Sequence, residues 1–117
     1  MGRGSYNGMH IRVHVTGDLL LFWLPPRTPN RVHTRFRQWL YGREVETADG
    51  KYRYRRWGAL ERERHVLLYT GAVILPKGAG KRIAAMLRQK GAVVLEREVV
   101  LTKDDRRRLR LHPRSPS

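Results

Sequence analysis

Arginine and aromatic side chains are concentrated in one stretch of the chain, residues 28–58. The guanidinium group forks onto phosphate oxygens and stacks on flat rings, and exposed aromatic rings stack on unpaired bases. This combination suits a polyanion that carries flat rings, and it therefore predicts contact with a nucleic acid. The predicted contact residues in this stretch are Arg31, Arg35, Arg37, Tyr41, Arg43, Lys51, Tyr52, Arg53, Tyr54, Arg55, Arg56 and Trp57.

The whole chain is strongly basic, with 25 Lys and Arg against 10 Asp and Glu in 117 residues and a net charge of +15. Such an excess repels itself unless an anionic partner is present. Near the C-terminus a further basic cluster extends the predicted contact with phosphates; it consists of Arg106, Arg107, Arg108 and Arg110. RNA is favoured over DNA because exposed rings suit unstacked bases, and a membrane partner is not expected.

A glycine-rich segment at residues 77–81 lies between a predicted strand and a predicted helix, where phosphate-binding loops occur. It does not match a Walker A loop, because Leu75 replaces the first glycine and Arg82 replaces the Ser or Thr after the lysine. Free N–H groups at a helix start can still hold one phosphate, so we predict a weak site at Lys77, Gly78, Gly80 and Lys81. A plain glycine-rich turn is the alternative.

Residues for metal or covalent chemistry are sparse. The chain has no cysteine, and His10 and His14 lie about 13 Å apart on an extended strand, too far to share a metal ion. We predict no metal, cofactor or catalytic residue. A small metal-independent ribonuclease or strand-processing enzyme is an alternative, because the needed general acids, bases and cations are present. Those candidates are His33, Arg37, Tyr41, Lys51, Tyr52, Tyr54 and His65.

The predicted secondary structure begins with two strands. Apolar residues alternate from Met9 to Val15, which predicts a half-buried strand, and Gly17-Asp18 predicts a two-residue hairpin turn. The returning strand is then the apolar run Leu19–Leu24, with His14 opposite Leu21 and Arg12 opposite Trp23.

The arginine-rich stretch itself predicts a helix followed by a hairpin. Thr28 is a suitable N-cap, Pro29 suits the first helical position, and Gly42 is a natural C-cap. The helix buries a stripe of Val32, Phe36, Trp39 and Leu40. Asp49-Gly50 then predicts a hairpin turn between residues 43–48 and 51–57. Neither hairpin face is apolar, so either the tyrosine face packs and leaves the arginine face free, or the hairpin projects as a ribbon with two open faces.

The second half predicts a charged connector at residues 59–65, one long strand from Val66 to Leu75 with a bulge at Gly71, and a helix from about Ala79 to Lys90. A strand at 92–101 and a short basic helix capped by Thr102 follow.

These elements predict an α+β fold: a mixed, mainly antiparallel sheet of four to six strands, two principal helices and a short C-terminal basic helix. A ferredoxin-like arrangement is possible in the second half. We expect a flexible basic arm at residues 1–8, a single domain at 9–111 and a disordered tail at 112–117. The expected core is Ile11, Val13, Leu20, Phe22, Val32, Phe36, Leu40, Val73, Ile83, Leu87 and Val94. The leading functional hypothesis is a non-enzymatic, cytoplasmic nucleic-acid-binding protein; a basic structural subunit of a ribonucleoprotein particle is a further alternative.

Overall fold

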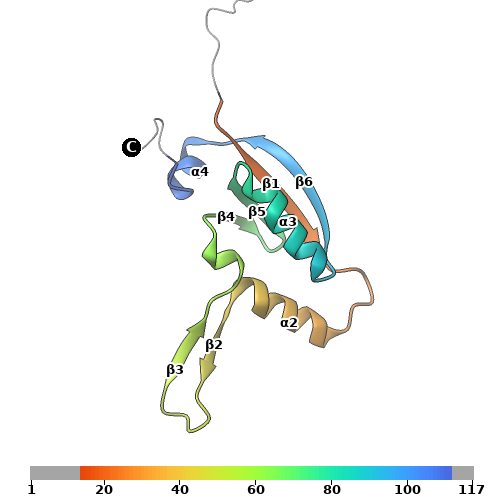
Figure 1. Cartoon of the computed structure of the whole chain (residues 1–117), viewed down its shortest axis with the longest axis vertical. Helices are drawn as coiled ribbons and strands as arrows, with labels where there is room; N and C mark the ends of the chain where they lie inside the picture. Colours follow the sequence, from red (N-terminus) through yellow and green to blue (C-terminus); the bar gives the residue numbers. More distant parts are fainter. Residues whose placement is uncertain (1–13, 112–117) are drawn as a thin grey trace, which may run out of the picture.

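A four-stranded sheet forms the body of the protein. The computed structural model describes residues 14–111, and the strands of the sheet are β1 (Thr16–Trp23), β4 (Val66–Tyr69), β5 (Ala72–Pro76) and β6 (Val93–Val100). They lie in the order β4-β5-β1-β6, and each neighbouring pair is antiparallel (Figure 1). β5 and β6 are therefore parallel to each other on the two sides of β1. The predicted α+β class and mainly antiparallel sheet are confirmed, and β1-α2-β4-β5-α3-β6 has the β-α-β-β-α-β connectivity of ferredoxin-like folds.

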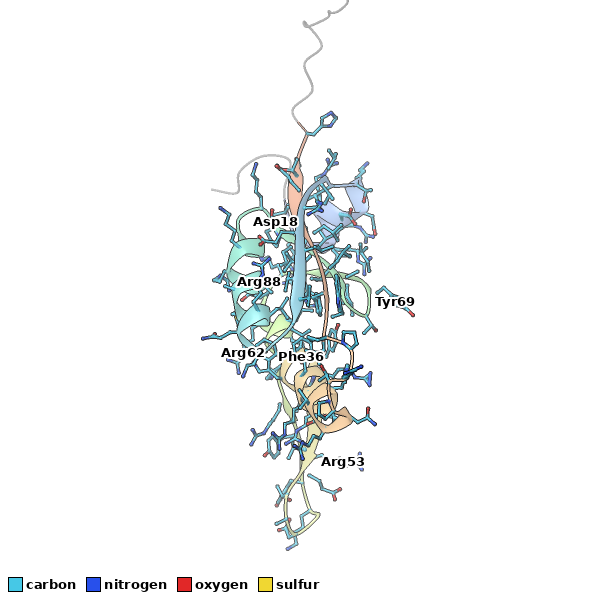
Figure 2. All side chains as sticks on the ribbon, turned by 90° about the vertical axis from the view of Figure 1, so that its right-hand side faces the viewer. Asp18, Phe36, Arg53, Arg62, Tyr69 and Arg88 are labelled. Atoms are coloured by element: carbon cyan, nitrogen blue, oxygen red, sulfur yellow. The ribbon has the colours of Figure 1, made fainter. Side chains whose placement is uncertain are left out.

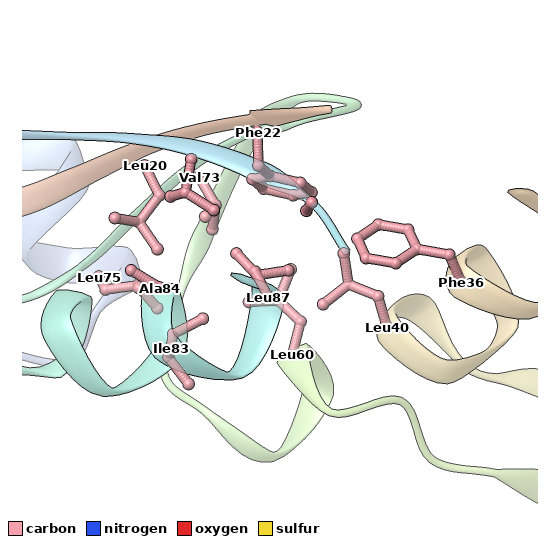
Figure 3. Close-up of a cluster of buried hydrophobic side chains, with 12 residues drawn as sticks. Leu20, Phe22, Phe36, Leu40, Leu60, Val73, Leu75, Ile83, Ala84 and Leu87 are labelled. Carbon is pink, nitrogen blue, oxygen red and sulfur yellow. The ribbon is translucent and has the colours of Figure 1, made fainter. Parts of the chain in front are cut away.

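The main core lies between one face of this sheet and two helices, α2 (Asn30–Tyr41) and α3 (Ala79–Gln89). Figure 3 shows the side chains of the three parts meeting, and the buried members of the cluster are Leu20, Phe22, Phe36, Leu40, Leu60, Val73, Leu75, Ile83, Ala84, Leu87, Ala92 and Val94. Most of the predicted core is thus confirmed. Val32 is only half-buried, and Ile11 and Val13 lie outside the described residues.

The opposite face of the sheet is covered at one end by α4 (Lys103–Arg108), and Figure 2 shows α3 and α4 on opposite sides of the strands. Val66, Ile74, Leu101 and Leu109 form a second, smaller buried cluster there. Thr102 caps α4 as predicted: its hydroxyl accepts the Asp105 N–H at 3.0 Å, and the Asp105 carboxylate accepts the Thr102 N–H at 3.1 Å. Within residues 14–111, no helix has the length and apolar character needed to cross a bilayer.

The predicted N-terminal hairpin is wrong, because Gly17 and Asp18 lie inside β1 and make no turn. Leu21 is paired with Ala72 and Leu95 rather than with His14. The glycine is explained by packing, since a Cβ atom on Gly17 would lie 2.8 Å from the Leu75 carbonyl oxygen. Residues 9–13 of the predicted first strand, the arm at 1–8 and the tail at 112–117 lie outside the described residues.

The predicted long strand at 66–75 is also two strands. β4 and β5 pair with each other through a tight turn at Thr70-Gly71, where Gly71 has a φ of +87°. A positive φ suits glycine because it has no Cβ atom to clash with the backbone.

The predicted N-cap of α2 is also wrong, because Thr28 does not cap the helix. Its hydroxyl instead donates to the Pro25 carbonyl oxygen at 2.6 Å, and Pro29 occupies the N-cap position.

Candidate nucleic-acid interface

The hairpin of β2 (Arg43–Glu46) and β3 (Arg53–Arg56) projects from the body beyond α2 (Figure 1). Its tip is closed by Thr47, whose N–H donates to the Tyr52 carbonyl oxygen at 2.9 Å. The carboxylate of Asp49 accepts the Thr47 hydroxyl at 2.6 Å and the Lys51 N–H at 3.0 Å. These two bonds, the Thr47 hydroxyl first, lower the pKa of Asp49 below its ordinary value. The predicted turn at Asp49-Gly50 is confirmed, with shorter strands than the sequence indicated.

The base of the hairpin is held by Glu61 in the short 3-10 helix Leu60–Arg62. One carboxylate oxygen accepts the Gly58 N–H at 2.8 Å, and the other accepts Arg55 at 2.6 Å and 3.1 Å. Arg55 also donates to the Tyr41 carbonyl oxygen at 3.0 Å. The Gly58 N–H, followed by Arg55, lowers the pKa of Glu61. The junction therefore fixes a hairpin that has no apolar face of its own.

The two faces of the hairpin differ in charge. Residues opposite each other on paired strands share a face, so Glu44 and Glu46 lie with their partners Arg55 and Arg53. Arg53 lies 3.5 Å from Glu46, and Arg55 is paired with Glu61. Acidic side chains therefore balance the cations of this face. This differs from the expectation of a free arginine face, because Arg55 is engaged at the junction.

The opposite face carries cations without carboxylates. Its cross-strand pairs are Arg43 with Arg56 and Val45 with Tyr54. The Tyr54 side chain is not packed against the core, because the residue is 45% exposed. The hairpin thus has the projecting form of the two arrangements predicted from the sequence, with its net positive charge on the tyrosine face.

This cationic face continues into a groove against α2. The α2–hairpin groove has a volume of about 310 Å³ and is lined by Arg35, Gln38, Trp39, Arg43, Arg56 and Trp57. Among residues 14–111, no carboxylate oxygen lies within 4.0 Å of the guanidinium groups of Arg35, Arg43 or Arg56. Trp57 is 62% exposed, and Gln38 accepts a hydrogen bond from Arg43 at 3.2 Å. The groove can therefore offer both cations and rings to a ligand.

The other predicted contacts are dispersed. Arg31 is exposed on the same flank of α2 as Arg35, whereas Arg37 and Tyr41 line a different pocket on the opposite flank. Lys51 and Tyr52 are exposed at the hairpin tip. Gln38 is not among the contacts predicted from the sequence and Trp39 is predicted in the core stripe, although both line the groove.

The C-terminal arginines are partly neutralised. Arg107 and Arg108 both pair with Asp104, and Arg106 is half-buried. Arg108 and Arg110 line a groove of about 350 Å³ with the connector, which contributes Glu61, Arg62, Glu63, Arg64 and His65. Arg62 and Arg64 are not among the contacts predicted from the sequence, since the connector alternates acidic and basic residues. Among the described residues these two arginines have no carboxylate partner, because Glu61 pairs with Arg55 and Glu63 pairs with Arg82.

The weak phosphate site at residues 77–81 is occupied by the protein itself. One oxygen of Asp18 accepts the N–H groups of both Gly78 and Gly80 at 2.8 Å. Lys77 is paired with Glu98 at 3.0 Å, which leaves Lys81 as the predicted member without a carboxylate partner among the described residues. The carboxylate of Asp18 takes the N–H groups that a phosphate would need, so these contacts give no support to a phosphate site here, which stays a prediction.

The residues considered for catalysis do not converge on one site. His33, Arg37 and Tyr41 line the pocket on one flank of α2, whereas His65 lies in the connector groove with its Nδ1 atom 2.8 Å from the Glu63 carbonyl oxygen. Tyr52, Tyr54 and Lys51 are on the hairpin. Over residues 14–111, no three His, Asp or Glu side chains are grouped closely enough to hold a metal ion.

Comparison of the chain with protein-family models, with curated proteins and with solved structures finds no match.

Proposed function

We propose that the protein binds unpaired nucleic acid, RNA in preference to DNA, in the α2–hairpin groove. The observation that carries the proposal is the convergence on this groove of two tryptophans and three arginines that have no carboxylate partner among residues 14–111. Arg43 and Arg56 come from opposite positions on paired strands, and Arg35 faces them from α2. Their guanidinium groups can hold successive phosphates along a strand.

The exposed rings supply the second part of recognition. Trp57 at the groove and Tyr54 on the adjoining hairpin face are 62% and 45% exposed. A ring stacks only on a base whose own face is uncovered, and such stacking contributes about 1–3 kcal/mol per base. Unpaired bases are common in RNA loops and ends, which is why RNA is favoured.

The asymmetry of the hairpin favours a strand lying along one face. A two-stranded ribbon can also enter the major groove of a duplex, where phosphates line both walls of the groove. Here one face carries Glu44 and Glu46, which would repel those phosphates, whereas the tyrosine face carries no carboxylate. The connector groove with Arg62, Arg64, Arg108 and Arg110 extends the cationic surface beyond the junction.

The test compares two triple variants that remove the same charge. Arg35→Gln, Arg43→Gln and Arg56→Gln remove the groove cations, whereas the control Arg53→Gln, Arg82→Gln and Arg107→Gln removes cations that are paired with carboxylates. Binding of labelled RNA, DNA and duplex oligonucleotides is measured by fluorescence anisotropy across salt concentrations.

We expect the groove variant to lower the slope of log affinity against log salt by about 0.7 per lost phosphate contact, or about 2 in total. A slope of 2 corresponds to an affinity change of about 16-fold between about 50 and 200 mM salt. The control variant should keep most of the slope. Equal losses in the two variants would show that binding follows net charge alone, and that result would refute the groove as the binding site.

A further inference from the structure

A second pocket lies on the other flank of α2. Its volume is about 460 Å³, and its lining comes from the end of β1, from α2 and from the β4–β5 turn: Phe22, Trp23, Leu24, Asn30, His33, Phe36, Arg37, Tyr41, Thr70 and Gly71. Arg35 and Arg37 are two residues apart on a helix, so they point about 200° apart around its axis. The body of α2 therefore separates this pocket from the α2–hairpin groove.

Aromatic side chains form a large part of the pocket. Phe22 and Phe36 meet at the α2 end of the core, with ring centroids 6.4 Å apart (Figure 3). Both are buried, whereas Trp23 is 47% exposed and leaves much of its ring open to solvent. A flat ligand can thus lie between buried phenyl rings and an exposed indole.

Polar groups from α2 face the same space. Asn30, His33, Arg37 and Tyr41 follow one flank of the helix and can all donate hydrogen bonds. The Tyr41 hydroxyl accepts the Gly71 N–H at 3.2 Å, which holds the oxygen in place and leaves its own proton for a ligand. Arg37 has no carboxylate within 4.0 Å among the described residues, and no acidic side chain lines the pocket.

We propose that this pocket binds a single nucleotide. The base lies against the aromatic lining beside Trp23, and the phosphate is held by Arg37 with His33 as a second donor. The volume falls within the range of about 300–1,000 Å³ that is usual for small-molecule sites, which commonly combine an apolar lining with a few placed donors. The nucleotide is either free or an unpaired residue of a strand, and the proposal stands whether or not the α2–hairpin groove binds RNA.

The probes are AMP, UMP and adenosine, and the readout is the indole N–H signal of each tryptophan in ¹H–¹⁵N spectra. Trp23 reports on this pocket, while Trp39 and Trp57 report on the α2–hairpin groove. Trp23→Leu identifies the first signal. We expect AMP to shift the Trp23 signal, adenosine to bind more weakly, and Arg37→Gln to raise the Kd for AMP about tenfold, as loss of one charged hydrogen bond implies.

Arg97→Gln is the matched control, since Arg97 is an exposed arginine of β6 that lines neither this pocket nor the α2–hairpin groove, and its loss should leave the Kd for AMP unchanged. Equal effects of the two substitutions, or no shift of the Trp23 signal at millimolar AMP, would overturn the proposal. Competition with labelled RNA separates the two sources. If a strand supplies the nucleotide, AMP and Arg37→Gln both weaken RNA binding; if the nucleotide is free, neither does. Failure of RNA to bind at all would leave the AMP result intact and count only against the α2–hairpin groove.

Discussion

Glu61 should be the acidic residue on which the hairpin most depends. Its carboxylate accepts three hydrogen bonds, one from Gly58 and two from Arg55, and its side chain is 21% exposed. Glu61→Gln keeps the shape but removes the charge and one acceptor oxygen. Hydrogen bonds to charged groups contribute about 1.5–3 kcal/mol each, and water can replace part of this at a partly exposed site. We therefore expect a loss of about 2 kcal/mol, which corresponds to a fall in Tm of about 10 °C for a domain of this size.

The control for this prediction is Glu44→Gln on the same hairpin. It makes the same change in net charge, and Glu44 has no cation within 4.0 Å among residues 14–111. Its effect should stay within about 0.5 kcal/mol. Calorimetry and circular dichroism at neutral pH measure both variants.

The effect of Glu61→Gln should also depend on pH in a defined direction. Folding lowers the pKa of Glu61 below its ordinary value of 4.5, so its stabilisation is fully present above that pH and is lost as the pH falls through the folded pKa. Glu63, Glu98 and Asp104 also have lowered pKa values, so wild type and variant both lose stability in acid. The difference between them isolates Glu61 and should shrink below pH 4.5. Equal Tm values for the Glu61→Gln and Glu44→Gln variants would refute the role of Glu61 at the base of the hairpin. A Tm difference between wild type and Glu61→Gln that persists in acid would refute it as well.

Three further substitutions, one of them a control, test the close contacts of the fold by urea unfolding. Gly58→Ala would bring a Cβ atom against the backbone of Leu40 and Gly42, so it should cost more than about 2 kcal/mol. Gly50→Ala is the control, because its new Cβ atom would lie no nearer than 4.0 Å to other atoms, and it should lose only the about 1–2 kcal/mol of left-handed backbone strain. Equal losses of stability in the two variants would contradict a steric clash at Gly58. Asp18→Ala removes the acceptor of two N–H groups at the start of α3 and should lower the free energy of unfolding by about 2 kcal/mol. Amide exchange at Gly78 and Gly80 should become faster. Unchanged exchange would show that Asp18 does not cap α3.

Local signals predicted the elements whose partners lie nearby in the sequence. The Asp49-Gly50 turn joins strands that pair with each other, and the apolar spacing of Phe36 and Leu40 identifies the buried face of α2. The α3 helix and the capped α4 helix are likewise defined by their own residues. In each case the deciding contacts are within about one helix or hairpin of the signal.

The wrong predictions share a different cause. Gly17-Asp18 resembles a turn, but β5 and β6 pair with the two edges of β1, so the segment stays extended. Both partner strands lie more than about fifty residues away in the sequence. Asp18 then caps α3 rather than a turn. At Gly71 the sequence predicts a bulge instead of a turn, because the segments on both sides of it are apolar. Partners distant in the sequence decide these conformations, and a short window of residues does not contain them.

The candidate interface is defined as much by the acidic residues as by the arginines. Each of the ten carboxylates has a place away from the α2–hairpin groove. Three of them stabilise local structure: Asp18 accepts hydrogen bonds at the start of α3, Asp49 at the tip of the hairpin, and Asp105 belongs to the capping box of α4. Six others form ion pairs: Glu46, Glu61, Glu63, Glu96, Glu98 and Asp104. Glu44, the tenth, lies opposite Arg55 on the balanced hairpin face.

Composition shows only that cations exceed carboxylates, and the sequence predicts contact by Arg53 and Arg55 as well as by Arg43 and Arg56. The fold separates these two pairs, because alternation along β2 sets both of its glutamates on the face of Arg53 and Arg55. Arg43 and Arg56 are left beside Tyr54 with no carboxylate on their face. For this reason the strand that we propose to bind should follow the tyrosine face into the α2–hairpin groove, and Arg55 should act mainly as a support for that surface.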